Sequence, residues 1–145
     1  MKNRAAMADL VTAGPEPGLL AYVDGRPVGW IAVAPREEYG QLVRSPTFKP
    51  PDPAEQGVFA ITCFFVHSEA RRRGVARRLV RAAVAHARSR GATAVEAYAA
   101  DALGGTSSQD FMGVKQWFLD EGFHPVRRAR SKTVVRYDLD PTVQR

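Results

Sequence analysis

One short stretch of the sequence combines residue types that bind anions. An apolar segment ends at Phe64–Val66, and a few residues later Arg71–Arg77 opens a helical pattern around Gly74. The first N–H groups of a helix lack partners within it, and the helix dipole adds partial positive charge there. Gly74 has no Cβ to keep a phosphate away from the backbone. We therefore predict an anion site at this turn, suited to a pyrophosphate.

Two better-known phosphate motifs do not match this turn. A Walker A loop would have a lysine and a serine or threonine after the glycine, and both are absent. A dinucleotide-binding turn would have several glycines after the first strand, whereas Gly74 stands alone and follows a strand in the middle of the chain.

The charge distribution points to the same region. The 145 residues carry a formal net charge of +6, and eight arginines lie between Arg71 and Arg90. No acidic residue lies between Glu69 and Glu96. We expect the anionic part of any ligand to bind near this segment.

The elements that must position the turn begin with a central strand. Apolar residues fill both alternating faces of Val58–Val66, which is typical of a strand covered on each side. One face is expected to hold Val58, Ala60, Thr62, Phe64 and Val66, and the other Phe59, Ile61, Cys63 and Phe65. A helix over Gly74–Arg90, ended by Gly91, and a parallel strand over Thr93–Ala99 complete a right-handed βαβ unit.

A hairpin is predicted before this unit. Strands over Leu19–Val23 and Val28–Ala34 flank Asp24-Gly25, a pair that favours a type I′ turn. A short helix is expected earlier, over Asn3–Ala13. The proline-rich segment Pro35–Gly57 is interpreted either as a flap over a site or as a disordered insertion.

A second helix and hairpin are predicted after the βαβ unit. A Gly/Ser-rich link, Gly104–Ser108, leads to a helix over Phe111–Glu121 that Gly122 ends. Strands over Phe123–Arg130 and Thr133–Leu139 then follow, joined at Ser131-Lys132.

This order of elements resembles the GNAT family, the Gcn5-related N-acetyltransferases. The family pattern at the turn, Arg/Gln-x-x-Gly-x-Gly/Ala, is met by Arg71, Gly74 and Ala76. The Gly122-Phe123 pair stands where the family has Gly-Phe after its second helix. The resemblance spans about Leu19 to Leu139, and we treat residues 1–145 as one domain.

The resemblance implies an α/β (α+β) fold, a mixed central sheet with helices on both faces, and acetyl-CoA as cosubstrate. It implies a turn around the pyrophosphate and a pantetheine arm between two parallel strands that splay apart. The cofactor-binding residues expected on this basis are Phe64, Phe65, Val66, Arg71, Arg72, Arg73, Gly74, Val75, Ala76, Arg77 and Phe118.

The sequence departs from the family in two places. The family often has a tyrosine, the proton donor to the departing thiolate, where this chain has Phe118, which has no proton to donate. Only 18 residues precede Leu19, so the family's first strand is expected to be missing. The Leu19–Val23 strand would then be an open edge, which a truncated start, another cover for the edge or pairing with a second chain could each explain.

Acceptor-side residues are expected around the splay. An alkyl amine, with a pKa of ~10.4, must lose a proton before it attacks a thioester, and a carboxylate or a water that it holds usually accepts the proton. The oxyanion that forms could be stabilised by a strand N–H near Phe65 or Val66. The substrate-side candidates are Glu37, Glu38, Glu96 and Tyr98, and no catalytic residue is assigned. Cys63 is interpreted as a small buried hydrophobe rather than a nucleophile, and the histidines have no matching metal ligands.

We predict a cytoplasmic N-acetyltransferase that acetylates a small-molecule or peptide amine by direct attack in a ternary complex. No apolar run approaches the ~20 residues that span a bilayer, and one cysteine excludes a disulfide framework. An alternative is a GNAT-fold module that binds CoA or acetyl-CoA with little or no turnover. A basic nucleic-acid-binding domain is the third possibility, although no recognised nucleic-acid motif is present.

Overall fold

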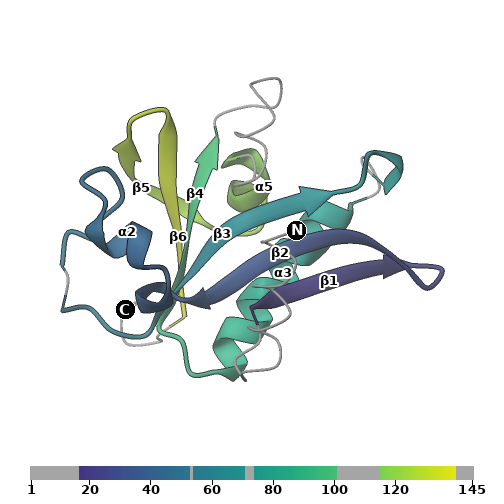
Figure 1. The fold of residues 1–145 in the computed structure, drawn as a ribbon, viewed down its shortest axis with the longest axis horizontal. Helices are drawn as coiled ribbons and strands as arrows, with labels where there is room; N and C mark the ends of the chain where they lie inside the picture. Colours follow the sequence, from purple (N-terminus) through teal and green to yellow (C-terminus); the bar gives the residue numbers. More distant parts are fainter. Residues whose placement is uncertain (1–16, 53, 71–73, 101–114, 140–145) are drawn as a thin grey trace.

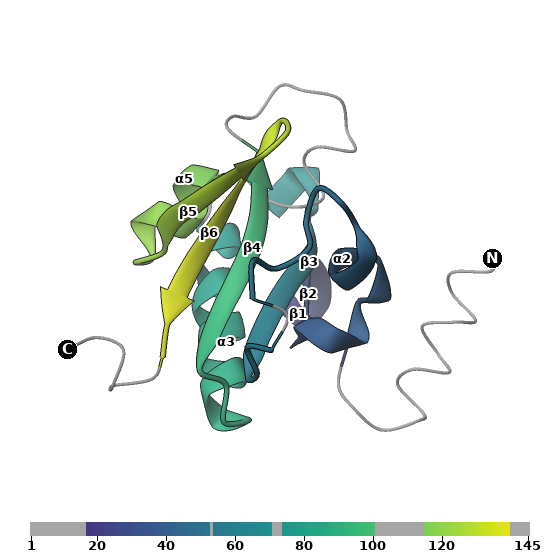
Figure 2. The same ribbon diagram turned by 90° about the vertical axis from the view of Figure 1, so that its left-hand side faces the viewer.

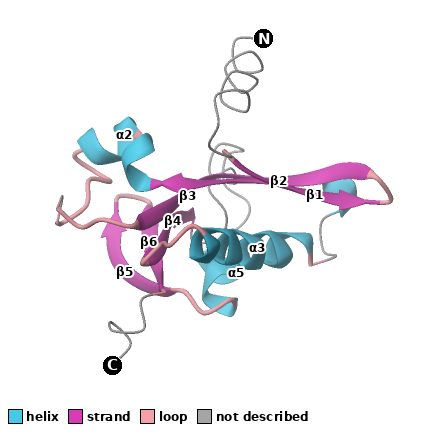
Figure 3. Ribbon diagram, turned by 90° about the horizontal axis from the view of Figure 1, so that it is seen from below, coloured by secondary structure: helices cyan, strands magenta, loops and turns pink. Residues whose placement is uncertain are grey.

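The computed structural model describes residues 17–52, 54–70, 74–100 and 115–139. These residues form one mixed sheet of six strands in the order β1-β2-β3-β4-β6-β5. Helices α3 and α5 lie on one face of the sheet and α2 on the other (Figure 3). The predicted fold class is therefore confirmed. The expected helix over Asn3–Ala13 lies outside the described residues, as does the Gly/Ser-rich link.

The first hairpin forms as predicted. Strand β1 (Gly18–Val23) pairs antiparallel with β2 (Arg26–Pro35). Asp24 and Gly25 have φ angles of 51° and 79°, the left-handed values that a type I′ turn requires. Among the described residues, β1 forms one edge of the sheet, with Leu20 and Tyr22 exposed. Pairing of this edge with a second copy stays a prediction.

The segment between β2 and β3 is packed against the sheet. It contains a short 3₁₀ helix η1 (Arg36–Glu38) and a short helix α2 (Gly40–Arg44). Leu42 is buried with Ala60, Tyr98, Ala129 and Val134, and Phe48 packs on this cluster. The arrangement favours the flap over the disordered insertion.

Strand β3 (Val58–Val66) has the predicted bounds, but the predicted faces are wrong in its second half. Its register with β2 passes from Ala32↔Cys63 to Val33↔Ile61, which leaves Thr62 as an extra residue. Such a bulge shifts the side-chain alternation by one. Phe64 and Val66 therefore join Phe59 and Ile61 in the main core, on the face that α3 covers.

Helix α3 (Val75–Ser89) buries one side against this face. The buried residues recur at helical spacing and are Val75, Leu79, Val80, Ala83, Val84 and Ala87. Burying each of the larger of these side chains is worth about 1.5–3 kcal/mol. A short 3₁₀ helix η2 (Ser68–Ala70) lies between β3 and α3.

The remaining elements complete the sheet and its helical layer. Strand β4 (Ala94–Ala100) is buried throughout and pairs parallel with β3, as predicted. Helix α5 is described over Lys115–Asp120, and residues 111–114 of the predicted helix lie outside the described part. Strands β5 (His124–Ala129) and β6 (Lys132–Asp138) pair antiparallel. Their turn is one residue earlier than predicted, because Ala129 pairs with Lys132 and Arg130 takes the positive φ of 56°.

Candidate functional site

The parallel strands β3 and β4 pair over only part of their length. Their register runs from Val58↔Ala94 to Ile61↔Ala97 and stops there. Strand β3 continues to Val66 and β4 to Ala100, so the two strands part beyond Ile61 and Ala97. Figure 1 shows them diverging from a common end. This is the splay that the sequence resemblance implied.

The β3 bulge coincides with the point where the strands part. Thr62 is the extra residue in the register with β2, and it follows directly after Ile61, the last residue paired with β4. Beyond this point β3 is held by β2 alone, through pairs such as Ile31↔Phe64 and Trp30↔Phe65. The bulge thus places Thr62 at the opening of the splay.

Helix α3 starts beyond the end of β3 with its first turn uncapped. Gly74, the N-cap residue, is left-handed (φ 76°) and makes no side-chain cap hydrogen bond, and the first turn contains no acidic residue. A Cβ added at Gly74 would meet no atom within 4 Å among the described residues. A helix N-terminus without a side-chain cap, its dipole, and open space among the described residues fit a phosphate group.

Two of the described arginines near this helix end, Arg77 and Arg81, pair with carboxylates at the end of α5 and just beyond it. Arg77 Nη2 lies 2.9 Å from Asp120 Oδ2, and its Nε lies 3.9 Å from Glu121 Oε1. One turn further on, Arg81 Nε donates to Glu121 Oε2 at 2.6 Å. In the first turn of α3, Arg77 is therefore paired with carboxylates. Arg71, Arg72 and Arg73 lie outside the described residues, so their predicted phosphate contacts stay predictions.

The other predicted cofactor residues differ in exposure. Val75 is buried and Ala76 partly buried in the first turn of α3. Phe65 is 43% exposed, whereas Phe64 and Val66 are buried. Phe118 is fully buried, with its ring centroid 6.2 Å from that of Phe64 and 5.3 Å from that of Phe123. The aromatic side chain at the family's tyrosine position is thus a core residue here.

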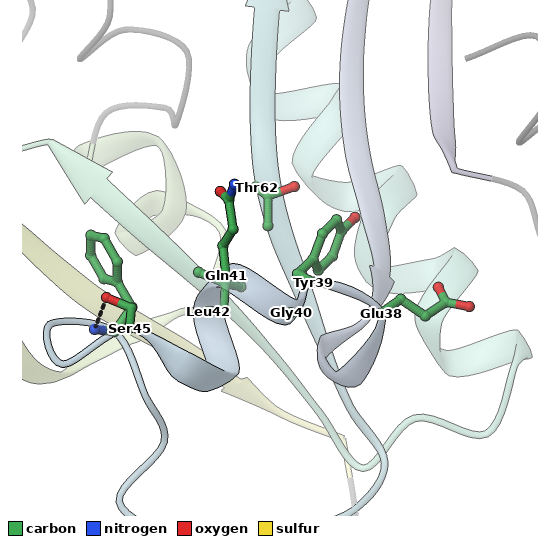
Figure 4. Close-up of a pocket in the computed structure, with 8 residues that line it drawn as sticks. Glu38, Tyr39, Gly40, Gln41, Leu42, Ser45 and Thr62 are labelled. Atoms are coloured by element: carbon green, nitrogen blue, oxygen red, sulfur yellow. Dashed lines mark hydrogen bonds between the residues drawn. The ribbon is translucent and has the colours of Figure 1, made fainter. Parts of the chain in front are cut away.

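A pocket of about 730 Å³ opens beside the splay, on the face of the sheet that carries α2. Its walls come from the segment after β2 and from Thr62 of β3 (Figure 4). The described residues that line it are Glu38, Tyr39, Gly40, Gln41, Leu42, Ser45, Phe48 and Thr62. Its size is typical of small-molecule sites.

Tyr39 lines the pocket together with Thr62, the extra residue of the β3 bulge. Burial raises the pKa of Tyr39 above its ordinary value, although the nearby Thr62 side chain acts to lower it. In Figure 4 the Tyr39 and Gln41 side chains flank Thr62, with Glu38 at the opposite end from Ser45. Tyr39 therefore stays protonated at neutral pH and is able to donate a hydrogen bond.

Of the four predicted substrate-side residues, only Glu38 lines the pocket. Glu37 is exposed and does not line it. Sequence reasoning did not single out Thr62 or Phe48. Thr62 could have been found as the one hydroxyl residue within the apolar run of β3, whereas nothing in the sequence places Phe48.

Glu96 is part of a buried ion-pair network instead. Its Oε1 accepts a hydrogen bond from Arg36 Nη1 at 2.8 Å, and its Oε2 accepts one from Arg136 Nη1 at 3.2 Å. Glu55 closes the ring, because Arg136 Nη2 donates to its Oε2 at 2.8 Å and Arg36 Nη2 lies 3.5 Å from its Oε1. Arg36 and Arg136 therefore occupy both carboxylate oxygens of Glu96.

Tyr98 lies beneath the pocket rather than in it. Its side chain is fully buried, and its ring meets that of Phe48 edge-on at 5.3 Å. Its hydroxyl has no hydrogen-bond partner among the described residues. Burial raises the pKa of Tyr98 to about 12, so it is neutral at physiological pH.

Two other kinds of functional feature are absent from the described residues. No helix in the described part of the chain is long and apolar enough to cross a membrane. No three His, Cys, Asp or Glu side chains within it are grouped as metal ligands would be.

Comparison with known proteins gives one family and many similar folds. A family model described as "Acetyltransferase (GNAT) family" matches residues 2–112. No curated protein matches the sequence.

The similar solved structures include three of wide coverage. Ribosomal-protein-alanine N-acetyltransferase from Brucella melitensis is 18% identical with a TM-score of 0.63, and the match covers 95% of this chain and 78% of that one. Ard1 from Thermoplasma volcanium is 17% identical with a TM-score of 0.61, covering 94% and 79%. YncA from Salmonella typhimurium, solved with its cofactor acetyl-CoA, is 17% identical with a TM-score of 0.61, covering 97% and 74%. At these identities the likeness establishes the fold.

Proposed function

The chain belongs to the GNAT family of acetyltransferases, and from that premise we propose that it transfers an acetyl group from acetyl-CoA to a primary amine. The proposed reaction is a direct attack in a ternary complex. The amine nitrogen forms a C–N bond with the acetyl carbon, the C–S bond breaks, and the products are an acetamide, CoA and one proton.

The observation that carries this proposal is the parting of β3 and β4 just before the uncapped start of α3. Strand pairing ends at Ile61↔Ala97, and α3 begins after Gly74 with no cap and no acid in its first turn. An extended arm with an anionic end fits this pair of features, since the arm enters between the strands and the phosphates meet the helix N-terminus. A cofactor with both parts is CoA.

We assign the cofactor contacts accordingly. The backbone of Phe64–Val66 would bind the acetyl and pantetheine part, and residues Arg71–Ala76 would bind the phosphates. Arg77 would join them only by leaving Asp120, which lies 2.9 Å away. Phe118 would support the site from the core through Phe64, because it has no exposed surface.

Acetyl-CoA would supply the acetyl group as a thioester, and the protein would align and deprotonate the amine. A free alkyl ammonium has a pKa of ~10.4, so a carboxylate such as Glu38, or a water that it holds, would take the proton. The CoA thiolate has a pKa of ~8.5, which makes it a leaving group that needs little help. The absence of a hydroxyl at Phe118 is therefore compatible with turnover.

Calorimetric titration of acetyl-CoA and CoA tests the cofactor site without relying on turnover. We expect micromolar binding by the wild type and a loss of at least about tenfold in affinity for Gly74→Glu, which places a carboxylate at the helix N-terminus. Gly91→Glu is the matched control, because Gly91 has a similar φ of 80° and open space at the other end of α3. Absence of binding by folded wild-type protein, or an equal loss in both variants, would contradict the proposal.

A second candidate is a module that binds CoA without turnover. The burial of Phe118 favours it, because no hydroxyl stands at the position of the family's proton donor. Tight binding of acetyl-CoA with no transfer to any amine of a mixed panel would select this candidate. The nucleic-acid-binding alternative gains little from Arg77 and Arg81, since Asp120 and Glu121 already pair with them. Random duplex DNA that binds with a steep salt dependence would revive it.

A further inference from the structure

We propose that the pocket between α2 and the β3 bulge binds the acceptor, and that the acceptor is a small primary ammonium with an apolar or aromatic body. This inference rests on the proposed function, because it names the second substrate of the same site.

The position of the pocket connects it to the reacting centre. Thr62 lines the pocket and also stands where β3 and β4 part. A group bound beside Thr62 therefore lies next to the splay on the side that α3 does not occupy. The cofactor arm and the acceptor would reach the same point from different directions, as a ternary complex requires.

The one charged side chain that lines the pocket, among the described residues, favours a positively charged acceptor. Glu38 is the one carboxylate among the described residues that line it, and no described arginine or lysine lines it. Two arginines adjoin the lining without being part of it: the Arg44 guanidinium lies beside Gly40, and Arg127 Nη2 donates to the Phe48 carbonyl at 3.1 Å. The arginines around Glu96 are paired with carboxylates. In a chain of net charge +6, a cavity whose lining is neutral apart from one carboxylate disfavours acidic acceptors and attracts ammonium groups.

The other lining residues favour an acceptor that is apolar apart from its amine. Leu42 and Phe48 contribute apolar side chains to the lining, and the Phe48 ring meets the buried Tyr98 ring edge-on at 5.3 Å. Aromatic rings bury large areas and bind flat or aliphatic groups without charged partners. The ammonium end would lie near Glu38, Tyr39 and Thr62, and the apolar end near Leu42 and Phe48.

Tyr39 is assigned as a positioning residue. Its side chain lies between those of Thr62 and Glu38 in the pocket (Figure 4). Its neutral hydroxyl there could accept a hydrogen bond from the amine. Glu38 would accept the proton that the ammonium releases, either directly or through one water.

A matched set of amines tests the substrate class. We expect phenethylamine to be acetylated with a catalytic efficiency, kcat/KM, about tenfold above that of two comparison amines. These are phenylalanine, which adds a carboxylate, and ethylamine, which lacks the ring. A peptide with a free N-terminus is the competing acceptor. A higher catalytic efficiency with the peptide than with phenethylamine would overturn the proposal.

Substitutions in the pocket test the roles assigned to Glu38, Phe48 and Tyr39. Glu38→Gln is expected to lower the catalytic efficiency with phenethylamine by about tenfold, whereas Glu37→Gln, the same charge change on an exposed neighbour outside the pocket, leaves it unchanged. Phe48→Ala is expected to raise KM more than it lowers kcat. Tyr39→Phe is expected to lower kcat and to shift its pH profile. Equal effects of Glu38→Gln and Glu37→Gln would exclude a role for this pocket.

Direct binding separates this inference from the proposed function. Calorimetric titration of phenethylamine, with and without CoA, reports on the pocket even if no acetyl group is transferred. Binding that Glu38→Gln weakens would support the pocket assignment even in a protein that does not bind acetyl-CoA. Absence of binding in a protein that does bind acetyl-CoA would overturn the pocket assignment and leave the proposed function in place.

Discussion

Arg36 and Glu96, sixty residues apart in the sequence, form an ion pair of 2.8 Å in which both side chains are at most 5% exposed. Arg36 follows β2, and Glu96 lies in β4, so the pair crosses over β3 and ties the start of the pocket segment to the far half of the sheet. Arg136 and Glu55 complete the ring. The ion pair thus anchors the start of the segment whose later residues line the pocket.

Loss of one member of this ring is expected to destabilise the fold. Glu96→Gln leaves the buried Arg36 and the partly buried Arg136 with one carboxylate fewer between them, and breaking a buried pair such as Arg36–Glu96 costs about 3 kcal/mol. Urea denaturation followed by circular dichroism measures the change in the free energy of unfolding. Asp120→Asn, which breaks a largely exposed ion pair, is the control and should change it little. Equal stability of the two variants would show that the ring contributes nothing.

The stability of the protein should fall in acid partly through Glu55. Hydrogen bonds from Arg136 hold the pKa of the Glu55 carboxyl below its ordinary value of 4.5, and the charges of Arg136 and Arg36 add to this. A lowered pKa in the folded state contributes stability above the ordinary pKa, and this contribution is lost as the pH falls through the folded value. Glu55→Gln should therefore flatten the decline in melting temperature below about pH 5. A decline as steep as that of the wild type would count against this role.

Removing the Tyr98 hydroxyl should stabilise the protein. The group is buried without a partner among the described residues, and an unsatisfied hydroxyl of this kind costs about 1 kcal/mol or more. Tyr98→Phe is expected to raise the free energy of unfolding by about that amount in urea denaturation. A loss of stability would mean that the hydroxyl has a partner, such as a buried water.

Charge at the start of α3 should tune the affinity for CoA. Asp120 neutralises Arg77 in the first turn of the helix, beside the proposed phosphate site. Asp120→Asn should tighten CoA binding about two- to threefold at low salt and less at high salt, because it frees Arg77 and removes a negative charge. Asp52→Asn makes the same charge change in the exposed loop after α2. If it tightens binding equally, the effect comes from net charge alone.

Local signals in the sequence were enough to predict most of the framework. Asp24-Gly25 fixes a hairpin because few other pairs adopt two positive φ angles. Gly74 and Gly91 mark the ends of α3, and its apolar spacing gives the buried side. The parallel pairing of β3 and β4 followed from the rule that βαβ units are right-handed and short connections are favoured.

The details of the site depend on contacts that no local pattern encodes. The extra residue Thr62 reverses the alternation of β3, and both alternating faces of its sequence are apolar, so the pattern could not reveal the shift. Glu96 was interpreted as a substrate-side residue because its partners Arg36 and Arg136 are 60 and 40 residues away in the sequence. The pocket wall at Phe48 likewise follows from how an irregular segment packs.

The limited pairing of β3 and β4 also has a mechanical consequence. The sheet is in effect two three-stranded panels, β1-β2-β3 and β4-β6-β5, joined along four residue pairs at one end (Figure 2). A ligand that binds between the panels at their open end would contact both of them and so connect them at a second place. Its binding free energy therefore adds to the free energy that holds the panels together, and saturating ligand should slow amide exchange in both panels at once. Binding of the proposed cofactor at the splay would therefore also determine how firmly the two halves of the sheet are held together.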